Sequence, residues 1–274
     1  MKIKLGICNF CVPGTGVFAP EIVSELGLDG MSIEFGPYTN GWPLSQRDLQ
    51  NRYLNAREKY GIEYCNIGVS DGDNIPFHAR KGTKEDQIVD LEADKAVDAA
   101  AYMGIPCVFF SHFRRSENRT QEDLERTAER YRRICDCAQE KEIQIACEMP
   151  NSSESQKILV QMVDRENFSL LYDSGNYEGL TDFDGYEILK ELYPSLSNQM
   201  HIKDGMKGEN ASRILGTGNA RFLEKIRFLK EKKFSGWLIL ENLYEQKPMR
   251  DLNPSCIEIL KEDIKWLKEA VKDF

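Results

Sequence analysis

The sequence has 274 residues, of which 41% are hydrophobic, and its 45 acidic against 36 basic residues give a formal net charge of −9. A chain of this length and apolar content buries one sizeable core, so we expect a single domain over residues 1–274. The acidic balance opposes binding to nucleic acid, because few basic side chains would replace the counterions of a phosphate backbone.

No apolar run is long enough to cross a bilayer, and the first apolar stretch is broken at Asn9 and Pro13. We therefore expect a soluble, cytoplasmic protein with no membrane partner. The eight cysteines are spread along the chain, which is typical of reduced thiols in a cytosol. Cys8 and Cys11 form a lone C-x-x-C, the spacing of a redox pair or of half a zinc site, without a second pair at metal spacing.

Short apolar runs alternate with longer amphipathic segments along the whole chain. The runs are rich in Ile, Val, Leu, Phe and Cys, as in strands that are buried on both faces, and cover residues 3–9, 31–35, 63–69, 107–113, 143–148, 169–173, 198–203 and 237–241. Helical periodicity is clearest over residues 46–60, 84–103, 120–141, 219–233 and 257–272. Eight such repeats predict an α/β fold, a single (β/α)8 TIM barrel. A doubly wound sheet is the alternative, but its G-x-G-x-x-G after the first strand is missing.

Four consecutive expected strands end in side chains that can bind a metal, namely Glu148, Asp173, His201 and Glu241. Each acid alone is as well explained by a helix N-cap or a solvated loop. Because neighbouring strands of a barrel lie about 5 Å apart, however, groups at their carboxyl ends can converge. Three oxygen donors and one imidazole favour Mn(II), Mg(II) or Co(II), with zinc as the next choice. We therefore predict one divalent metal ion at this end of the barrel.

Five segments together resemble the xylose-isomerase-like TIM-barrel superfamily, in its sugar (phosphate) isomerase/epimerase branch. They are residues 147–150 (CEMP), 172–176 (YDSGN), 201–204 (HIKD), 215–219 (LGTGN) and 240–242 (LEN). The resemblance spans nearly the whole chain and is strongest from Glu148 onward.

The resemblance implies a metal bound by Glu148, Asp173, His201 and Glu241, with substrate oxygens completing its shell. In the ketose 3-epimerases of this superfamily, the glutamates that match Glu148 and Glu241 stand on opposite faces of the sugar and move the proton. A metal that holds a carbonyl oxygen and its neighbouring hydroxyl stabilises an enediolate. We therefore expect a metal-dependent isomerase or epimerase of a small ketose or keto-sugar.

The sequence departs from the epimerase pattern at two positions. Those enzymes carry His three residues after the metal Asp and Arg six residues after the metal His, where this chain has Asn176 and Lys207. The second acid after Glu148 is matched by Glu154, which we expect to hold a substrate hydroxyl. Lys207 has a single ammonium where the epimerases have the planar, forked guanidinium of arginine. The two groups bind substrate oxygens differently, so the same sugar need not bind.

Four further residues are candidates for substrate binding. His112 ends the fourth expected strand and either donates to a substrate oxygen or orients a neighbour. Lys203 has the strand parity of His201 and is expected to reach the pocket or to pair with Glu148 or Glu241. Glu34 ends the second strand. Trp42, in the loop after it, either covers a sugar face or packs the loop.

Three rival functions remain open. A lyase or dehydratase on a keto-sugar or keto-inositol would use the same metal site and expel a group from the enediolate. An abasic-site (AP) endonuclease of the superfamily would need more ligands than His78, His112 and His201 provide. A non-catalytic sugar-binding subunit would keep the fold and lose the chemistry. Relatives often form dimers or tetramers, so the resemblance also implies a homo-oligomer.

Overall fold

The computed structural model describes residues 3–14, 16–272 and 274 of the protein. The barrel strands are β1 (Lys4–Cys8), β2 (Gly30–Glu34), β3 (Glu63–Val69), β4 (Cys107–Ser111), β5 (Gln144–Glu148), β6 (Phe168–Asp173), β7 (Leu196–Ile202) and β10 (Trp237–Leu240). Within the described residues these strands pair as a closed barrel in the order β1-β10-β7-β6-β5-β4-β3-β2. The predicted (β/α)8 TIM barrel is confirmed.

Contacts divide the chain into two compact units, each made of separate stretches of sequence. The first unit takes in the chain up to Met31, Tyr60–Glu63 and everything from Tyr172 onward, and the second takes in Ser32–Lys59 and Tyr64–Leu171. The first unit carries the helices α1 (Ala19–Glu25), α6 (Asn176–Leu180), α7 (Gly185–Leu192), α8 (Phe222–Glu231) and α9 (Cys256–Val271). The second carries α2 (Arg47–Tyr60), α3 (Lys84–Met103), α4 (Gln121–Gln139) and α5 (Ser153–Val163). The single domain over residues 1–274 stays a prediction.

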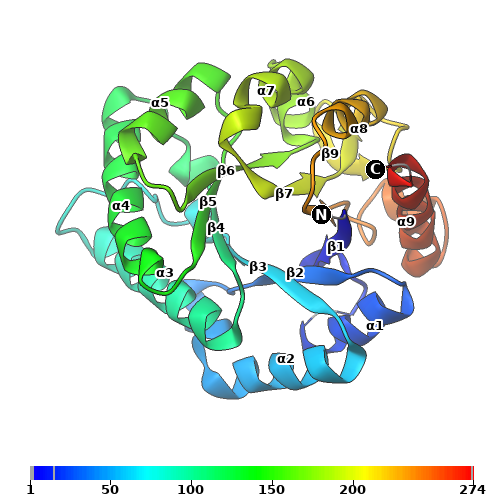
Figure 1. Ribbon diagram of the computed structural model, residues 1–274, viewed down its shortest axis with the longest axis horizontal. Coiled ribbons are helices and arrows are strands. Elements are labelled where there is room, and N and C mark those ends of the chain that lie inside the picture. The colour runs from blue at the N-terminus through cyan, green and yellow to red at the C-terminus, as the bar shows by residue number, and fades with distance from the viewer. Residues whose placement is uncertain (1–2, 15, 273) are drawn as a thin grey trace. The chain divides into compact units, whose positions relative to one another are not determined.

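In the second unit, the helices α3, α4 and α5 pack side by side, as Figure 1 shows. Helix α4 begins with a capping box, in which Thr120 and Asp123 each accept a hydrogen bond from the other's backbone N–H. Its buried residues include an apolar stripe at helical spacing, made of Leu124, Ala128, Tyr131 and Cys135. The stripe buries the inner face of the helix, as the periodicity predicts.

In the first unit, strand register fixes the positions of the residues that follow the strands. Ile239 of β10 is the register partner of His201 in β7, and Leu240 is the partner of Ile202. Since Glu241 directly follows Leu240, its backbone lies beside that of Lys203. The backbone N–H of Glu241 donates to Ile202 O at 2.9 Å, which continues the ladder by one more bond.

The structure contains elements that the sequence pattern did not indicate. A short antiparallel hairpin, β8 (Asp204–Met206) and β9 (Glu209–Arg213), follows β7. Its turn contains Gly208, whose φ of 79° suits glycine. Helix α6 has only five residues and includes Gly179, so it is too short for a periodic signal. None of the helices in the described ranges has the length and apolar content needed to cross a membrane.

Candidate active site

Three of the predicted ligands lie together in the first unit. Asp173, His201 and Glu241 each offer one ligand atom, and these atoms lie within 4.8 Å of one another. His201 Nδ1 faces Glu241 Oε2 at 3.5 Å and Asp173 Oδ2 at 4.0 Å. The imidazole is fully buried, and only 13% of the Glu241 side chain is exposed. Burial raises the pKa of Asp173 to about 6, although the Lys203 ammonium opposes the rise.

Lys203 places a positive charge against the two carboxylates of this cluster. Its Nζ donates to Glu241 Oε2 at 2.6 Å and lies 3.0 Å from Asp173 Oδ2. Of the two glutamates expected as partners of Lys203, the structure pairs it with Glu241. Two carboxylates and an imidazole suit a hard or borderline cation, and the contacts of the ammonium show that the two carboxylates attract positive charge.

Cys8, at the end of β1, is a residue of the site that sequence reasoning missed. Its Sγ lies 3.8 Å from His201 Nε2, on the side of the ring opposite the nitrogen that faces Asp173 and Glu241. Burial raises the pKa of the Cys8 thiol well above its ordinary value. Cys8, His201 and Glu241 also bring one ligand atom each within 4.8 Å of one another, as a metal-binding group requires. The C-x-x-C spacing was the available signal in the sequence, and both of its cysteines are free thiols in the structure.

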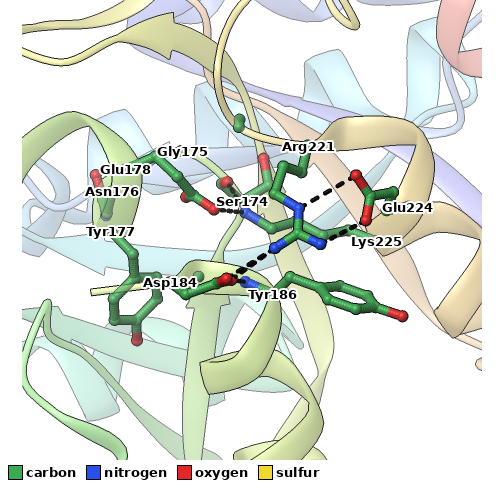
Figure 2. Close-up of polar contacts among 12 residues, drawn as sticks. Ser174, Gly175, Asn176, Tyr177, Glu178, Asp184, Tyr186, Arg221, Glu224 and Lys225 are labelled. Atoms are coloured by element: carbon green, nitrogen blue, oxygen red, sulfur yellow. Dashed lines mark hydrogen bonds and ion pairs between the residues drawn. The ribbon is translucent and has the colours of Figure 1, made fainter. Parts of the chain in front are cut away.

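The Asp173 carboxylate is held by the turn that follows it. The backbone N–H groups of Gly175 and Asn176 both donate to Asp173 Oδ1 at 2.8 Å. The buried Lys225 secures this turn from α8, because its Nζ donates to Ser174 O and to Glu178 Oε1, both at 2.7 Å (Figure 2). With Oδ1 engaged by amides, Oδ2 is the oxygen that faces His201.

Beside this turn, Arg221 joins two neighbouring helices (Figure 2). Its guanidinium donates to Asp184, the N-cap of α7, at 2.8 and 3.0 Å, and to Glu224 of α8 at 2.5 Å. It also lies 4.7 Å from the centre of the Tyr186 ring. These contacts fix α7 against α8.

The buried Asp204 organises the glycine-rich segment 215–219. Its Oδ1 accepts from the backbone of Gly205 and Ala220, and its Oδ2 accepts from Gly216 and Gly218, at 2.8–3.1 Å. A side chain at Gly218 would overlap Asp204 Oδ1. The Asp of the H-x-K-D motif therefore accepts hydrogen bonds from the backbone N–H groups of the G-x-G motif, and the two motifs form one local structure.

Asn242, the residue after Glu241, is hydrogen-bonded to Asp204 and Asp263. Asn242 Oδ1 accepts from the Asp204 N–H at 3.1 Å, and its Nδ2 donates to Asp263 Oδ2 at 2.7 Å. Asp263, on α9, also accepts from Tyr244 Oη at 2.9 Å. Burial raises the pKa of Asp263 to about 6. The sequence pattern gave no sign of this network, because its members lie on three separate elements.

In the second unit, Glu148 ends β5 and is 4% exposed. Its carbonyl accepts from the His112 N–H at 2.8 Å. The His112 ring is fully buried, with Nε2 2.7 Å from Tyr131 Oη and the ring 4.5 Å from that of Phe77. Burial lowers the pKa of His112 to about 3. These contacts support the orienting alternative for His112 rather than donation to a substrate.

The structure favours the packing alternative for Trp42 as well. The residue is 6% exposed, and its indole N–H donates to Glu92 Oε1 at 2.9 Å, so its face is not open to a sugar.

Glu34 ends β2 as predicted, and desolvation raises the pKa of its carboxyl. Glu154 lies exposed in the first turn of α5. Its charge there complements the N-terminal dipole of the helix.

The two positions that depart from the epimerase pattern lie in the first unit. Asn176 is buried, and its Oδ1 accepts from Asn210 Nδ2 of β9 at 2.9 Å, so it ties α6 to the hairpin. Lys207 lies in the hairpin turn, is largely exposed and forms an ion pair with Asp182.

A family model described as a xylose isomerase-like TIM barrel matches residues 20–270. The chain belongs to this family. Over 273 residues it is 24% identical to the 2-epi-5-epi-valiolone 7-phosphate 2-epimerase of Actinoplanes sp., covering 98% of this chain and 95% of that protein.

Two solved structures show the same fold. The D-allulose 3-epimerase from Methylomonas sp. matches with a TM-score of 0.77 and 15% identity, over 98% of each chain. The probable 3-DHS dehydratase of petrobactin synthesis from Bacillus anthracis matches with a TM-score of 0.72 and 14% identity, over 97% of this chain and 98% of that one. The barrel is thus shared by proteins named as epimerases and as a dehydratase.

Proposed function

We propose that the protein is a metal-dependent isomerase or epimerase of a small ketose or keto-sugar. The observation that carries this proposal is the buried cluster of Asp173, His201 and Glu241, whose ligand atoms lie within 4.8 Å of one another. The named 2-epimerase, which is related over nearly the whole chain, supports the reaction class.

Asp173, His201 and Glu241, together with Glu148, would hold one divalent cation. Strand β5 is paired with β6, and Cys147 is the register partner of Leu170, so Glu148 and Asp173 both end their strands at the same edge of this pair. Oxygen donors with one imidazole favour Mn(II), Mg(II) or Co(II). When bound, such a cation supplies Lewis-acid stabilisation of the negative charge that develops on an enediolate.

The protein's own carboxylates would move the proton. A carboxylate that removes the proton next to a carbonyl and a second that returns one on the other face invert the centre, and Glu148 and Glu241 are our candidates for these two roles. One carboxylate acting twice would instead shift the carbonyl, giving an isomerase. Lys203, held at 2.6 Å from Glu241, would keep that glutamate oriented and offer a donor to a substrate oxygen.

A lyase or dehydratase is the second candidate, favoured by the similarity to the probable 3-DHS dehydratase. It shares the first step, removal of a proton next to a carbonyl. The outcomes then differ, because the enediolate expels a β-hydroxyl as water instead of being reprotonated. Loss of water from a keto-sugar, detected by mass, separates this candidate from epimerisation.

Solvent deuterium incorporation tests the proposal. The Mn(II)-loaded protein is incubated in D₂O with a panel of pentuloses, hexuloses and heptuloses, free and phosphorylated. We expect at least one ketose to gain deuterium, and we expect Glu241→Gln to abolish the gain at saturating Mn(II). Glu187→Gln, an exposed glutamate of α7, serves as the control. Absence of exchange and of water loss across the whole panel would count against both candidates.

A further inference from the structure

Two loops that follow neighbouring strands of the second unit are bound to each other, and one of them carries two arginines. The 3-10 turn η5 (Asp71–Asp73) follows β3, and η6 (Arg114–Ser116) follows β4. Ser116 Oγ donates to Gly72 O at 2.7 Å, and Arg115 donates to Asn74 O at 2.7 Å. The two turns are therefore bound to each other, and the arginine backbone has a fixed position.

An open cleft of about 650 Å³ lies against these loops. Its charged and titratable lining residues are Arg114, Arg115, Arg119, His78, Glu117 and Asp123. This volume lies within the range of small-molecule sites, about 300–1,000 Å³. The cleft thus carries three guanidinium groups.

The two acids of the cleft already have partners. Glu117 Oε2 accepts from both Nε and the terminal nitrogen of Arg119, at 3.0 and 2.7 Å. Asp123 accepts from Arg126 at 2.8 Å and from the Thr120 N–H. The two acids therefore neutralise the charges of Arg119 and Arg126. They do not neutralise the positive charges that Arg114 and Arg115 bring to the cleft.

Arg114 and Arg115 keep donors for a ligand. The Arg114 side chain is 76% exposed, and its carboxylate contact, to Asp73, is 3.5 Å long, beyond a good hydrogen bond. In its bond to the neutral carbonyl of Asn74, Arg115 uses the single nitrogen Nη1. A guanidinium has five N–H donors in a planar fork, which matches the oxygens of a phosphate group.

The backbone of Arg114 is strained. Its φ is 51°, in the left-handed region that side chains rarely adopt because it costs free energy. A glycine would avoid this cost.

The cleft lies toward the end of the unit that carries Glu148. His112, two residues before Arg114, donates its N–H to Glu148 O at 2.8 Å. The pKa of the Asp73 carboxyl is raised, mainly by desolvation. The Arg114 charge lowers this pKa, and the Glu148 charge raises it. Arg114 and the proposed catalytic glutamate thus belong to one edge of the second unit.

We propose that Arg114 and Arg115 bind the phosphate monoester of a phosphorylated keto-sugar. This inference rests on the proposed function, since it assigns the substrate class of the same site. The two guanidinium groups bind the dianionic phosphate at the far end of the sugar, and the carbonyl end lies toward Glu148. Because of these phosphate contacts, the protein binds sugar phosphates more tightly than free sugars.

Isothermal titration of the full-length, Mn(II)-loaded protein tests this assignment. The probes are D-fructose 6-phosphate, D-fructose and inorganic phosphate, each at constant ionic strength. The wild type should bind the sugar phosphate with a Kd at least tenfold below that of the free sugar. The double variant Arg114→Gln/Arg115→Gln should lose this difference and should bind inorganic phosphate at least tenfold more weakly.

Arg52→Gln, on the exposed surface of α2, is the matched control and should behave as the wild type. Metal content and the unfolding midpoint of each variant are measured alongside, so that loss of the metal site or of the fold is recognised separately. Equal binding of sugar and sugar phosphate by a folded, metal-loaded wild type would overturn the assignment. A double variant that keeps the preference for phosphate would do so as well. Failure of deuterium exchange with intact phosphate binding would instead count against the proposed function alone.

Discussion

The ammonium nitrogen of Lys203 lies 2.6 Å from Glu241 Oε2, within the cluster of proposed metal ligands. A positive charge here repels a divalent cation, and at an effective dielectric constant near 20 such repulsion amounts to several kcal/mol at about 5 Å. We expect Lys203→Met to bind Mn(II) at least tenfold more tightly in a calorimetric titration. Lys190→Met, an exposed substitution on α7, controls for the change in net charge. Weaker binding by Lys203→Met would mean that the lysine helps to build the site.

The carboxylate of Asp204 accepts four backbone N–H bonds, from Gly205, Gly216, Gly218 and Ala220. Asp204→Ala leaves these amides without their acceptor, so we expect a loss of about 3–5 kcal/mol in the free energy of unfolding in urea. Asp182→Ala removes only a surface ion pair and should change stability by less than about 1 kcal/mol. Similar losses in both variants would contradict the structural role of Asp204.

Glu92 is buried beside Asp71, and burial together with that neighbour raises its pKa to about 9. The unfolded chain releases this proton from about pH 4.5 upward, whereas the folded protein retains it to about pH 9. The wild type should therefore lose stability as pH rises through this window, by roughly 1 kcal/mol per pH unit. Glu92→Gln mimics the protonated acid and should lack this loss, which urea unfolding at pH 6 and pH 9 would show. Parallel stability profiles would mean that Glu92 is ionised in the folded state.

The buried Lys225 is paired with Glu178, and it also donates to Ser174 O. Lys225→Met leaves the carboxylate of Glu178 without its ammonium, so we expect a loss of about 3–5 kcal/mol in unfolding free energy. The double variant Lys225→Met/Glu178→Leu removes both charges and should recover most of that loss in the same measurement. If the double variant is no more stable than the single one, the carbonyl of Ser174 is the partner that matters.

Strand positions and strand ends could be read from the sequence, because fully buried strands are short, continuous apolar runs. Seven of the predicted runs differ from β1, β2, β4, β5, β6, β7 and β10 by a few residues at their ends, and β3 agrees at both ends. The convergence of Asp173, His201 and Glu241 followed from the same reasoning, since they end neighbouring strands.

The supporting residues could not be found in this way. Cys8 meets His201 across 193 positions of sequence, and Asp263 reaches Asn242 from the last helix. Such contacts depend on how elements pack, which periodicity does not encode. The aromatic Trp42 illustrates the same limit, because only the fold shows that its indole is bonded to Glu92 and buried.

Metal analysis of the purified wild type and of His201→Ala tests the central claim most directly. The proposal predicts near-stoichiometric divalent metal in the wild type after Mn(II) reconstitution, and its loss in a folded His201→Ala variant. A wild type that binds no metal after reconstitution, or a His201→Ala variant that keeps it, would contradict the claim.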